Sequence, residues 1–375
     1  MLVTFEDYRR AARRKLPRLM FDYVDGGSYA EHTLARNVSD FAEVELRQRV
    51  LRDVSELETG VELFGQKLAM PLALAPVGMA GLLAKRGELQ AARAAKAAGV
   101  PFCLSTLSIC GLDEVSKTAP PWFQLYVLKD RGYMRELLAK AKGLGSPVLV
   151  FTVDLPVPGS RYRDMRSGLF GGGVGPRQVM DVARHPGWLW DVWLNGRPHT
   201  FANAAPAVGK GAGFGDFWVW VRKNFDPTLT WDDLGWIREA WGGPIVIKGV
   251  LDAEDAQTAA SLGVDGIIVS NHGGRQLDGA PSAIKALPAV AEAVGDRAAV
   301  LMDGGVRTGL DVLKAMSLGA KACLIGRSWA FALAARGETG VASMLASMQA
   351  ELRTAMALTG CTDVAKAGRD LLFKA

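Results

Sequence analysis

Residues 244–278 read PIVIKGVLDAEDAQTAASLGVDGIIVSNHGGRQLD, and this stretch decides the fold class. It begins with an apolar, β-branched run (Pro244–Val250), continues with an Ala-rich segment that a glycine closes (Ala253–Gly263), and returns to a second apolar run (Gly266–Asn271). Continuous apolar runs of this length are typical of strands buried in a parallel sheet. A glycine directly after an Ala-rich amphipathic segment is typical of a helix C-terminus. The stretch therefore predicts one strand–helix–strand unit.

The same alternation recurs along the chain, and helices closed by glycine are also expected at Gly87–Gly99 and Leu310–Gly319. Eight such units indicate a closed (β/α)8 TIM barrel of the α/β class, and an open, doubly wound sheet is the alternative. We expect one domain over residues 1–375, with an N-terminal helical segment and a barrel core at about 70–360. The predicted strands are Pro71–Val77, Pro101–Thr106, Trp122–Val127, Val148–Asp154, Pro244–Val250, Gly266–Asn271, Ala299–Asp303 and Ala322–Gly326.

The connection between the fourth and fifth strands, Leu155–Gly243, is far longer than the others. We expect an insertion at about 165–230, because long connections in compact domains are usually functional. Basic residues outnumber acidic ones in it, as they do in Met1–Arg18. Two interpretations remain open: peripheral contact with an anionic membrane, or a Trp-rich lid over the barrel mouth. The tryptophans within the expected insertion, 165–230, are Trp188, Trp190, Trp193, Trp218 and Trp220.

Composition narrows the function classes. Apolar residues make up 49% and charged residues 22% of the chain, as in ordinary globular proteins, and no stretch of 18 consecutive apolar residues occurs. The four cysteines form no CxxC pair and no His-flanked cluster, so we expect neither disulfides nor a metal site. The net charge is +5, but nothing resembles a zinc finger, an RNP motif or a basic-region heptad, so no nucleic-acid partner is expected.

Polar and ionisable side chains gather at the ends of the predicted strands, where a barrel of this kind builds its active site. After the last two strands, Gly304-Gly305 and Gly326 would let backbone N–H groups approach an anion, with Arg307 and Arg327 as bidentate partners. Barrels often bind phosphate at this place, so we expect a phosphate site there. The other polar strand ends are Ser105-Thr106, Gln124-Leu125-Tyr126, Thr152-Val153-Asp154, Lys248-Gly249, Ser270-Asn271-His272 and Asp303.

His272 directly follows a predicted strand and is the candidate proton acceptor. A neutral imidazole accepts a proton near neutral pH, and Asp154, at another strand end, is the candidate carboxylate that orients it. The alternative is a strand-end histidine that only caps a turn. Arg275 and Arg161 would together fix a small carboxylate in planar fashion. Arg163, in contrast, is expected to be a solvated surface charge, as is Arg166.

Lys248 ends an otherwise apolar strand, so it needs an anionic partner. It could form a Schiff base, as in barrel aldolases. It could instead balance the negative charge of a reduced flavin, and this role fits the expected phosphate site and base better.

The segment Ser270–Asp278, SNHGGRQLD, resembles the signature of the FMN-dependent L-2-hydroxy acid oxidases and dehydrogenases. The similarity runs from Phe21-Asp22-Tyr23 to the C-terminal helices. Within the family, Asn195–His199 and Asn224–Pro227 most resemble the quinone-linked, membrane-associated L-lactate dehydrogenases. In membrane-bound members the long connection after the fourth strand carries the membrane contact.

The resemblance implies roles for individual residues. His272, paired with Asp154, would take up the substrate α-proton, and Tyr126 would contact the substrate hydroxyl. Arg161, Arg275 and Tyr23 would hold the substrate carboxylate. Residues implied to surround the isoalloxazine ring of FMN are Val77, Gly78, Ser105, Gln124, Thr152 and Lys248. Those implied to hold the ribityl phosphate are Asp303, Gly305, Arg307, Gly326 and Arg327, and Ser270 is a further expected cofactor contact.

The resemblance also implies the reaction. We expect oxidation of L-lactate to pyruvate, a quinone or another electron acceptor, peripheral attachment to the cytoplasmic side of the cell membrane, and a homotetramer or larger assembly. Gly78 stands where typical oxidases carry alanine, which favours a dehydrogenase, and Leu107 stands where glycolate oxidase carries tryptophan. The alternatives are an oxygen-using oxidase of glycolate, mandelate or longer 2-hydroxy acids, a flavin-free lyase or aldolase built on Lys248, and a non-catalytic phosphate-binding barrel.

Overall fold

The computed structural model describes residues 2–169, 175–205, 220 and 223–373. Eight strands pair in parallel in the order β3-β10-β9-β8-β7-β6-β5-β4, and a parallel bridge between Leu74 and Phe102 joins the two ends of this row. The sheet is therefore a closed barrel, which confirms the (β/α)8 prediction, and the doubly wound alternative is wrong. The strands are β3 (Leu72–Leu74), β4 (Cys103–Ser105), β5 (Trp122–Leu125), β6 (Leu149–Thr152), β7 (Ile245–Val250), β8 (Gly266–Val269), β9 (Ala299–Asp303) and β10 (Ala322–Ile325).

An antiparallel hairpin covers the N-terminal end of the barrel. It consists of β1 (Val61–Leu63) and β2 (Gln66–Leu68), and its tip residue Phe64 packs edge-on against Trp122, with ring centroids 5.7 Å apart. A Cβ atom on Gly266 would lie only 2.7 Å from the Phe64 ring, so a glycine is needed where β8 begins. The hairpin therefore closes this end of the barrel, mainly with apolar contacts.

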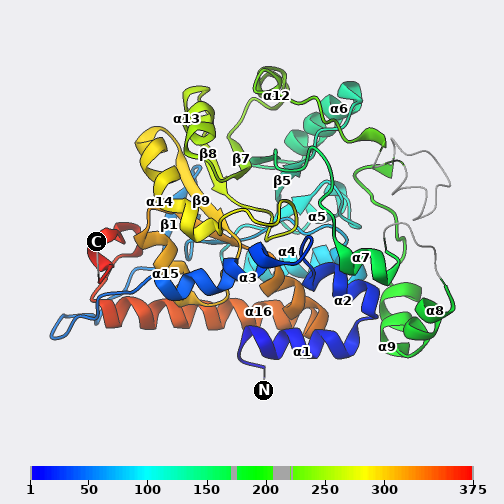
Figure 1. Cartoon of the computed structure of the whole chain (residues 1–375), viewed down its shortest axis with the longest axis horizontal. Helices are drawn as coiled ribbons and strands as arrows, with labels where there is room; N and C mark the ends of the chain where they lie inside the picture. Colours follow the sequence, from blue (N-terminus) through cyan, green and yellow to red (C-terminus); the bar gives the residue numbers. More distant parts are fainter. Residues whose placement is uncertain (1, 170–174, 206–219, 221–222, 374–375) are drawn as a thin grey trace.

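Helices surround the barrel (Figure 1). The glycine-closed segments expected to be helical are α4, α13 and α15, which confirms those predictions. The longest helix, α16, follows the last strand and bends at Arg336 and Gly337, where the backbone leaves helical geometry. The surrounding helices are α4 (Gly87–Ala97), α5 (Leu112–Val115), α6 (Arg131–Gly143), α12 (Asp233–Trp241), α13 (Ala253–Ser261), α14 (Ala283–Val294), α15 (Gly309–Ser317) and α16 (Arg327–Thr359). Short turns of helix are η1 (Asp40–Glu43), η2 (Ala80–Leu82), η4 (Gly295–Arg297), η5 (Val364–Lys366) and η6 (Arg369–Leu371).

Three N-terminal helices precede the barrel: α1 (Phe5–Lys15), α2 (Arg18–Asp25) and α3 (His32–Ser39). Helix α1 begins with a capping box, in which the side chain of Thr4 accepts a hydrogen bond from the Asp7 amide and the Asp7 carboxylate bonds back. It packs along α16, as Figure 1 shows. Helix α2 reaches the C-terminal end of the barrel, so the N-terminal segment contributes to the mouth.

The described part of the insertion after β6 is helical: α7 (Tyr162–Ser167), α8 (Pro176–Ala183), α9 (Pro186–Trp188) and η3, a π-helical turn (Leu189–Leu194). Its indole and amide groups tie it to the barrel. Trp188 donates a hydrogen bond to the carbonyl of Leu82, and the side chain of Asn203 accepts one from the Leu112 amide. Trp218, one of the tryptophans of the insertion, lies outside the described residues. No helix within 2–169, 175–205 or 223–373 is long and apolar enough to cross a membrane.

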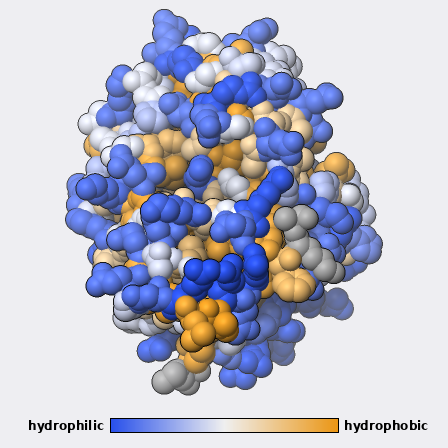
Figure 2. All heavy atoms as spheres, turned by 90° about the vertical axis from the view of Figure 1, so that its left-hand side faces the viewer, coloured by the Kyte–Doolittle hydropathy of each residue, from blue (hydrophilic) through white to orange (hydrophobic). Residues whose placement is uncertain are grey.

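One face of the molecule is mostly hydrophilic, with an apolar cluster near its lower edge (Figure 2). A loop before β1 projects on this side, at the left of Figure 1. Its residues Val50 and Leu51 are among the most exposed apolar side chains of the described chain.

Candidate active site

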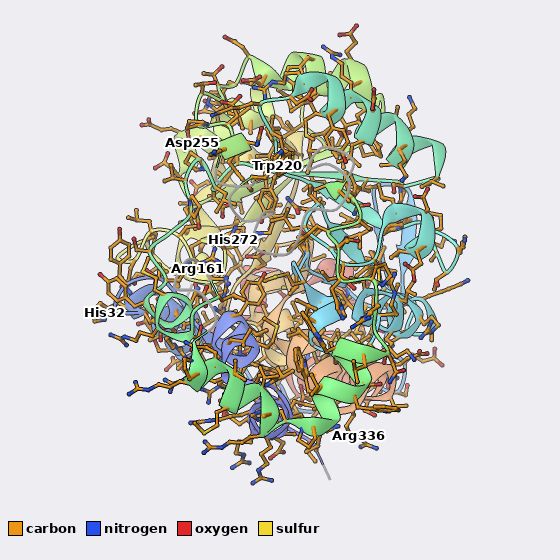
Figure 3. All side chains as sticks on the ribbon, turned by 90° about the vertical axis from the view of Figure 1, so that its right-hand side faces the viewer. His32, Arg161, Trp220, Asp255, His272 and Arg336 are labelled. Atoms are coloured by element: carbon orange, nitrogen blue, oxygen red, sulfur yellow. The ribbon has the colours of Figure 1, made fainter. Side chains whose placement is uncertain are left out.

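A cavity of about 760 Å³ opens at the C-terminal ends of the strands. It is lined by every expected site residue except Gln124, Asp154 and Ser270, and these three bond to residues that line it. His272 and Arg161 lie near the centre of the face seen in Figure 3. The lining residues expected from the sequence are Tyr23, Val77, Gly78, Ser105, Tyr126, Thr152, Arg161, Lys248, His272, Arg275, Asp303, Gly305, Arg307, Gly326 and Arg327.

His272 stands in a sharp turn after β8. Its φ is +58°, in the left-handed region that non-glycine residues rarely adopt, and its amide donates a 3.0 Å hydrogen bond to Ser270 Oγ. The imidazole Nδ1 lies 2.9 Å from Oδ1 of Asp154, and the Tyr126 hydroxyl lies 3.3 Å from Nε2. A Cβ atom on Gly249 would overlap the side chain of Asp154, so the glycine at the bulge in β7 makes room for this carboxylate. The turn therefore aims Nε2 into the cavity.

The electrostatics suit a proton acceptor. Burial lowers the pKa of His272 below its usual value, although the Asp154 carboxylate opposes the shift. Burial alone would raise the pKa of Asp154, but His272 and Lys248 outweigh it, so the pKa is lowered and the carboxylate stays ionised. Burial also raises the pKa of Tyr126, which keeps the phenol protonated. The imidazole is therefore neutral at neutral pH, and Nδ1–H donating to Asp154 leaves Nε2 able to accept.

Two arginines and a tyrosine form one wall of the cavity. Arg275 donates hydrogen bonds to the carbonyls of Tyr23 (2.5 Å) and Gly26 (2.9 Å), and its guanidinium lies 4.9 Å from the centroid of the Tyr23 ring. Arg161 Nε bonds weakly to the Arg275 carbonyl, at 3.3 Å. Burial, together with the neighbouring Arg275, lowers the pKa of Arg161 to about 10, so it remains a cation. The pair presents positive charge and planar N–H donors to a small carboxylate.

Lys248 finds the anionic partner that the sequence requires. Its Nζ lies 2.9 Å from Oδ2 of Asp303 and 2.9 Å from Oγ of Ser270, while Ser270 Oγ donates to Oδ1 of Asp303 at 2.5 Å. Burial alone would lower the pKa of Lys248, but Asp303 and Asp154 outweigh it and raise the pKa. A Schiff base would need the neutral amine, so this environment argues against the lyase or aldolase alternative.

The other end of the cavity is built for an anion. Gly305 has a φ of +90°, and a Cβ atom there would lie 1.7 Å from the Asn37 carbonyl oxygen, so no other residue fits. Arg307 and Arg327 lie partly buried beside it, and loss of hydration lowers the pKa of Arg307 to about 10 and that of Arg327 further. Arg327 is oriented by the carbonyls of Val24, Gly26 and Gly273. Two partly buried cations beside a glycine turn match a phosphate group.

Neutral polar groups connect the two ends. Gln124 accepts from Ser105 Oγ at 3.1 Å and donates to Thr152 Oγ1 at 3.1 Å, which fixes the orientation of its amide. Across the cavity, the Tyr23 hydroxyl donates to the carbonyl of Gly78 at 3.2 Å. A Cβ atom on Gly78 would lie 3.1 Å from that hydroxyl, so the glycine matters for the position of Tyr23.

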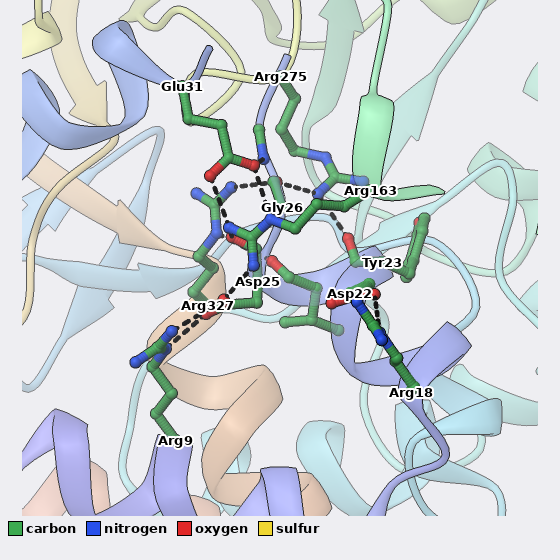
Figure 4. A network of polar contacts seen from close by, with 12 residues as sticks. Arg9, Arg18, Asp22, Tyr23, Asp25, Gly26, Glu31, Arg163, Arg275 and Arg327 are labelled. Carbon is green, nitrogen blue, oxygen red and sulfur yellow. Dashed lines mark hydrogen bonds and ion pairs between the residues drawn. The ribbon is translucent and has the colours of Figure 1, made fainter. Parts of the chain in front are cut away.

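Below this wall lies an ion-pair network that sequence reasoning missed (Figure 4). Asp25, at the end of α2, accepts hydrogen bonds from Arg9 and from Arg163, and Arg163 also forms two bonds of 2.7 Å with Glu31. The expectation that Arg163 is a solvated surface charge is therefore wrong. The carboxylates of α2 and the following turn draw the side chain inward, whereas Arg166 is exposed as expected. Because the carbonyls at this end of α2 hold Arg275 and Arg327, the network supports both ends of the cavity.

We expect Arg163→Leu to lower the stability of the folded protein by about 2 kcal/mol, because it leaves the carboxylates of Asp25 and Glu31 short of a partner. It should also raise the KM of the substrate several-fold, since the end of α2 positions Arg275. Thermal melting and steady-state kinetics would check both effects. Arg166→Leu, on the exposed side of the same helix, is the matched control, and equal behaviour of the two variants would contradict the role of the network.

Sequence reasoning also missed much of the apolar part of the lining, although it named Val77 and Leu107. Leu155, Met165 and Phe225 come from the connection after β6, and the Phe225 ring lies 5.4 Å from that of Tyr126. No motif marks such residues, because apolar side chains of a long connection look the same whether they face a cavity or a core. In the described parts of the chain, no group of three or more His, Cys, Asp or Glu side chains could hold a metal ion.

Comparison with known proteins agrees with this geometry. The profile of a family described as FMN-dependent dehydrogenase matches residues 12–374. A protein named L-lactate dehydrogenase from Caulobacter vibrioides (strain NA1000 / CB15N) is 59% identical over 368 residues, covering 98% of this chain and 96% of the relative. The structure of the monotopic membrane protein (S)-mandelate dehydrogenase superposes with a TM-score of 0.94 at 35% identity, covering 100% of both chains. A mandelate oxidase structure has a TM-score of 0.84 at 39% identity, covering 98% of this chain and 97% of its own.

Proposed function

The chain belongs to the FMN-dependent dehydrogenase family, and we propose that it oxidises L-lactate to pyruvate and passes the electrons to a quinone-type acceptor. It is an FMN-dependent L-2-hydroxy acid dehydrogenase. One observation supports L-lactate as the substrate. Relatives at 53–59% identity over nearly the whole chain are named L-lactate dehydrogenase, while the mandelate enzymes are 35–40% identical.

The residues present fit FMN. The glycine turn at Gly305 with Arg307 and Arg327 would take the ribityl phosphate, and Gly326 adds open space, since a Cβ there meets nothing closer than 3.9 Å. Val77, Gly78, Ser105 and Thr152 line the cavity between this turn and His272 and would hold the ring system, with Gln124 behind them. Lys248 supplies a fixed positive charge, backed by Ser270 and Asp303, for the negative charge that a reduced flavin carries.

The chain's own residues perform the remaining chemistry. Arg161 and Arg275 bind the substrate carboxylate, and Tyr23 packs against Arg275. When bound, FMN supplies the two-electron acceptor that turns the 2-hydroxy acid into a 2-oxo acid. His272 Nε2 takes up a substrate proton, and the Asp154 carboxylate stabilises the imidazolium that forms. Tyr126, whose hydroxyl lies beside Nε2, contacts the substrate hydroxyl. Holding the α-carbon in place in this way converts binding energy into rate.

The identity of the electron acceptor is tested by measuring turnover with a quinone analogue and with oxygen in separate assays. With L-lactate and a soluble quinone analogue under nitrogen, we expect full turnover. In air without the quinone, we expect slow turnover with little peroxide. Rapid, stoichiometric peroxide formation would replace this proposal with the oxidase alternative. Faster flavin reduction by L-mandelate or glycolate than by L-lactate would overturn the substrate assignment.

We further propose that the insertion contacts a membrane surface, on the cytoplasmic side, while its inner side lines the barrel mouth. Support comes from exposed apolar side chains on α8 and η3, among them Val179 and Trp190. Helix α8 lies beside α2, where the Arg18 amide donates to Asp181 at 2.6 Å. Helix α1, which carries exposed basic residues, lies along the same lower edge of the molecule as α8 (Figure 1). Apolar and basic groups together suit an anionic interface.

The double variant Val179→Ser/Trp190→Ser should bind anionic lipid vesicles at least about tenfold more weakly, because two exposed apolar anchors are lost. Co-sedimentation with vesicles would measure this, and flavin reduction by L-lactate should be unchanged. Leu262→Ser, which removes an exposed apolar residue at the end of α13, is the control. Vesicle binding equal to that of the control would rule out α8 and η3 as the contact.

The proposal includes a homotetramer or larger assembly. The projecting loop before β1 supports it, because Val50 and Leu51 offer exposed apolar surface to another copy of the chain. Light scattering on the purified protein tests this, and a monomeric mass would overturn it.

A further inference from the structure

Asp164 is a buried carboxylate that the proposed mechanism leaves without a role. It lies in the first turn of α7, three residues after Arg161, and its side chain is 1% exposed. Within the described residues, neither carboxylate oxygen has a hydrogen-bond partner. The nearest cationic atom is Nη1 of Arg161, 3.8 Å from Oδ2, which is an ion-pair distance but too long for a hydrogen bond. Buried carboxylates normally accept several hydrogen bonds, so this arrangement calls for an explanation.

The groups around Asp164 come from α2, α7 and the turn after β8. Arg161, Arg275 and Arg163 attract its negative charge, whereas Asp22, on α2, repels it. Burial raises the pKa of Asp164, against the effect of these arginines. Asp22 has its own partner, Arg18, at 3.2 Å. Asp164 is thus the carboxylate that faces the positive pair on the side away from the cavity.

We propose that Asp164 is a counter-ion that competes with the substrate carboxylate for the charge of Arg161 and so weakens the binding of carboxylates at this site. The inference rests on the proposed function, which assigns the substrate carboxylate to Arg161 and Arg275. Because Asp164 attracts Arg161 without a hydrogen bond, it reduces the positive charge but leaves the guanidinium N–H groups to the ligand. Substrate and product are both carboxylates, so a site with two partly buried arginines and no counter-ion would release the product slowly.

The test is the affinity of the flavin-loaded enzyme for propionate, which has the carboxylate of lactate but no hydroxyl and cannot be oxidised at this site. In Asp164→Asn, which keeps the shape and removes the charge, we expect the Kd of propionate to fall about tenfold, as the loss of one charge near the ligand implies. The KM of L-lactate should fall with it, and kcat should fall where product release limits turnover. Perturbation of the flavin spectrum by propionate would report the Kd.

The pH dependence separates this role from a structural one. Protonating Asp164 removes the competing charge, so in the wild type propionate should bind more tightly as the pH falls through the raised pKa of this carboxyl. His272 lines the same cavity and would also favour an anion when protonated, so the comparison is made in the His272→Gln background. There the dependence should persist with Asp164 present and be absent once Asp164→Asn is added. Asp22→Asn removes a neighbouring buried carboxylate that bonds to Arg18 instead, and it should keep the wild-type dependence.

Weaker or unchanged propionate binding in Asp164→Asn would overturn the proposal, because a carboxylate that merely positions Arg161 would cost affinity when removed. Asp164→Leu, which is also uncharged, should change the affinity for propionate in the same direction as Asp164→Asn. Agreement between the two variants shows that the loss of charge, and not a hydrogen bond of the asparagine amide, causes the change. The proposed function would instead be contradicted if L-lactate did not reduce the flavin of the wild-type protein. Failure of the Asp164 proposal and failure of the proposed function are therefore distinguishable.

Discussion

His272→Gln is expected to slow the reduction of bound flavin by L-lactate by at least about 10³-fold while leaving the flavin bound. Glutamine keeps a polar side chain in the turn after β8, but it cannot accept a proton. The Asp154 carboxylate, 2.9 Å from Nδ1, then has no imidazolium to stabilise. Anaerobic stopped-flow absorbance measures the reduction rate directly, without interference from the electron acceptor.

The pH dependence of this rate provides the control. Burial lowers the pKa of His272, so the neutral base persists below the usual pKa of a histidine, and the wild-type rate should fall only as the pH drops through this lowered value. The residual rate of His272→Gln should lack this step. A reduction rate within tenfold of the wild type would contradict the assignment of His272 as the proton acceptor.

Lys248→Met should cost about 3–5 kcal/mol of folding free energy, because it leaves the buried Asp303 carboxylate without its cation. Methionine keeps most of the apolar stem of lysine, so lost packing contributes little. Ser270 Oγ loses one of its partners as well, although it still bonds to Asp303 at 2.5 Å. The flavin-free protein would report stability by thermal melting, and the flavin-loaded protein should be reduced more slowly, since the charge that balances the reduced ring is gone.

The double variant Lys248→Met/Asp303→Asn tests the cause of this loss. If the unpaired carboxylate is responsible, removing its charge restores a large part of the stability but not the rate of flavin reduction. A melting temperature for Lys248→Met equal to that of the wild type would show that Asp303 is not held by Lys248.

The barrel could be predicted because its strands are buried on both faces and each ends in a turn residue. Pro244–Val250 and Gly266–Asn271 show this clearly, and the structure places β7 and β8 within them. The positions of Lys248, near the end of β7, and His272, just after β8, followed from the same rule, since the C-terminal ends of the strands lie at the open end of a barrel. Each partner lies two strands away, since Asp303 ends β9 while Lys248 is on β7, and Asp154 follows β6 while His272 follows β8. Alternate strands of a barrel bring side chains of one layer together, so these pairs can meet across the mouth.

Residues outside the strands could not be placed in this way. Tyr23 lies on α2, far from the barrel in the sequence, and only the family resemblance connected it to the site. Arg163 and Arg166 have the same chemistry and lie on one short helix, yet only Arg163 turns toward Asp25 and Glu31. Asp164 gives no signal at all, since burial of a charged residue depends on tertiary packing.

The most direct test of the function is the anaerobic absorbance spectrum of the purified protein before and after addition of L-lactate, with L-mandelate and glycolate in parallel. A flavin spectrum that bleaches fastest with L-lactate is the predicted result. A protein that cannot be loaded with FMN, or a bound flavin that none of these acids reduces, would contradict the assignment of this cavity to 2-hydroxy acid oxidation.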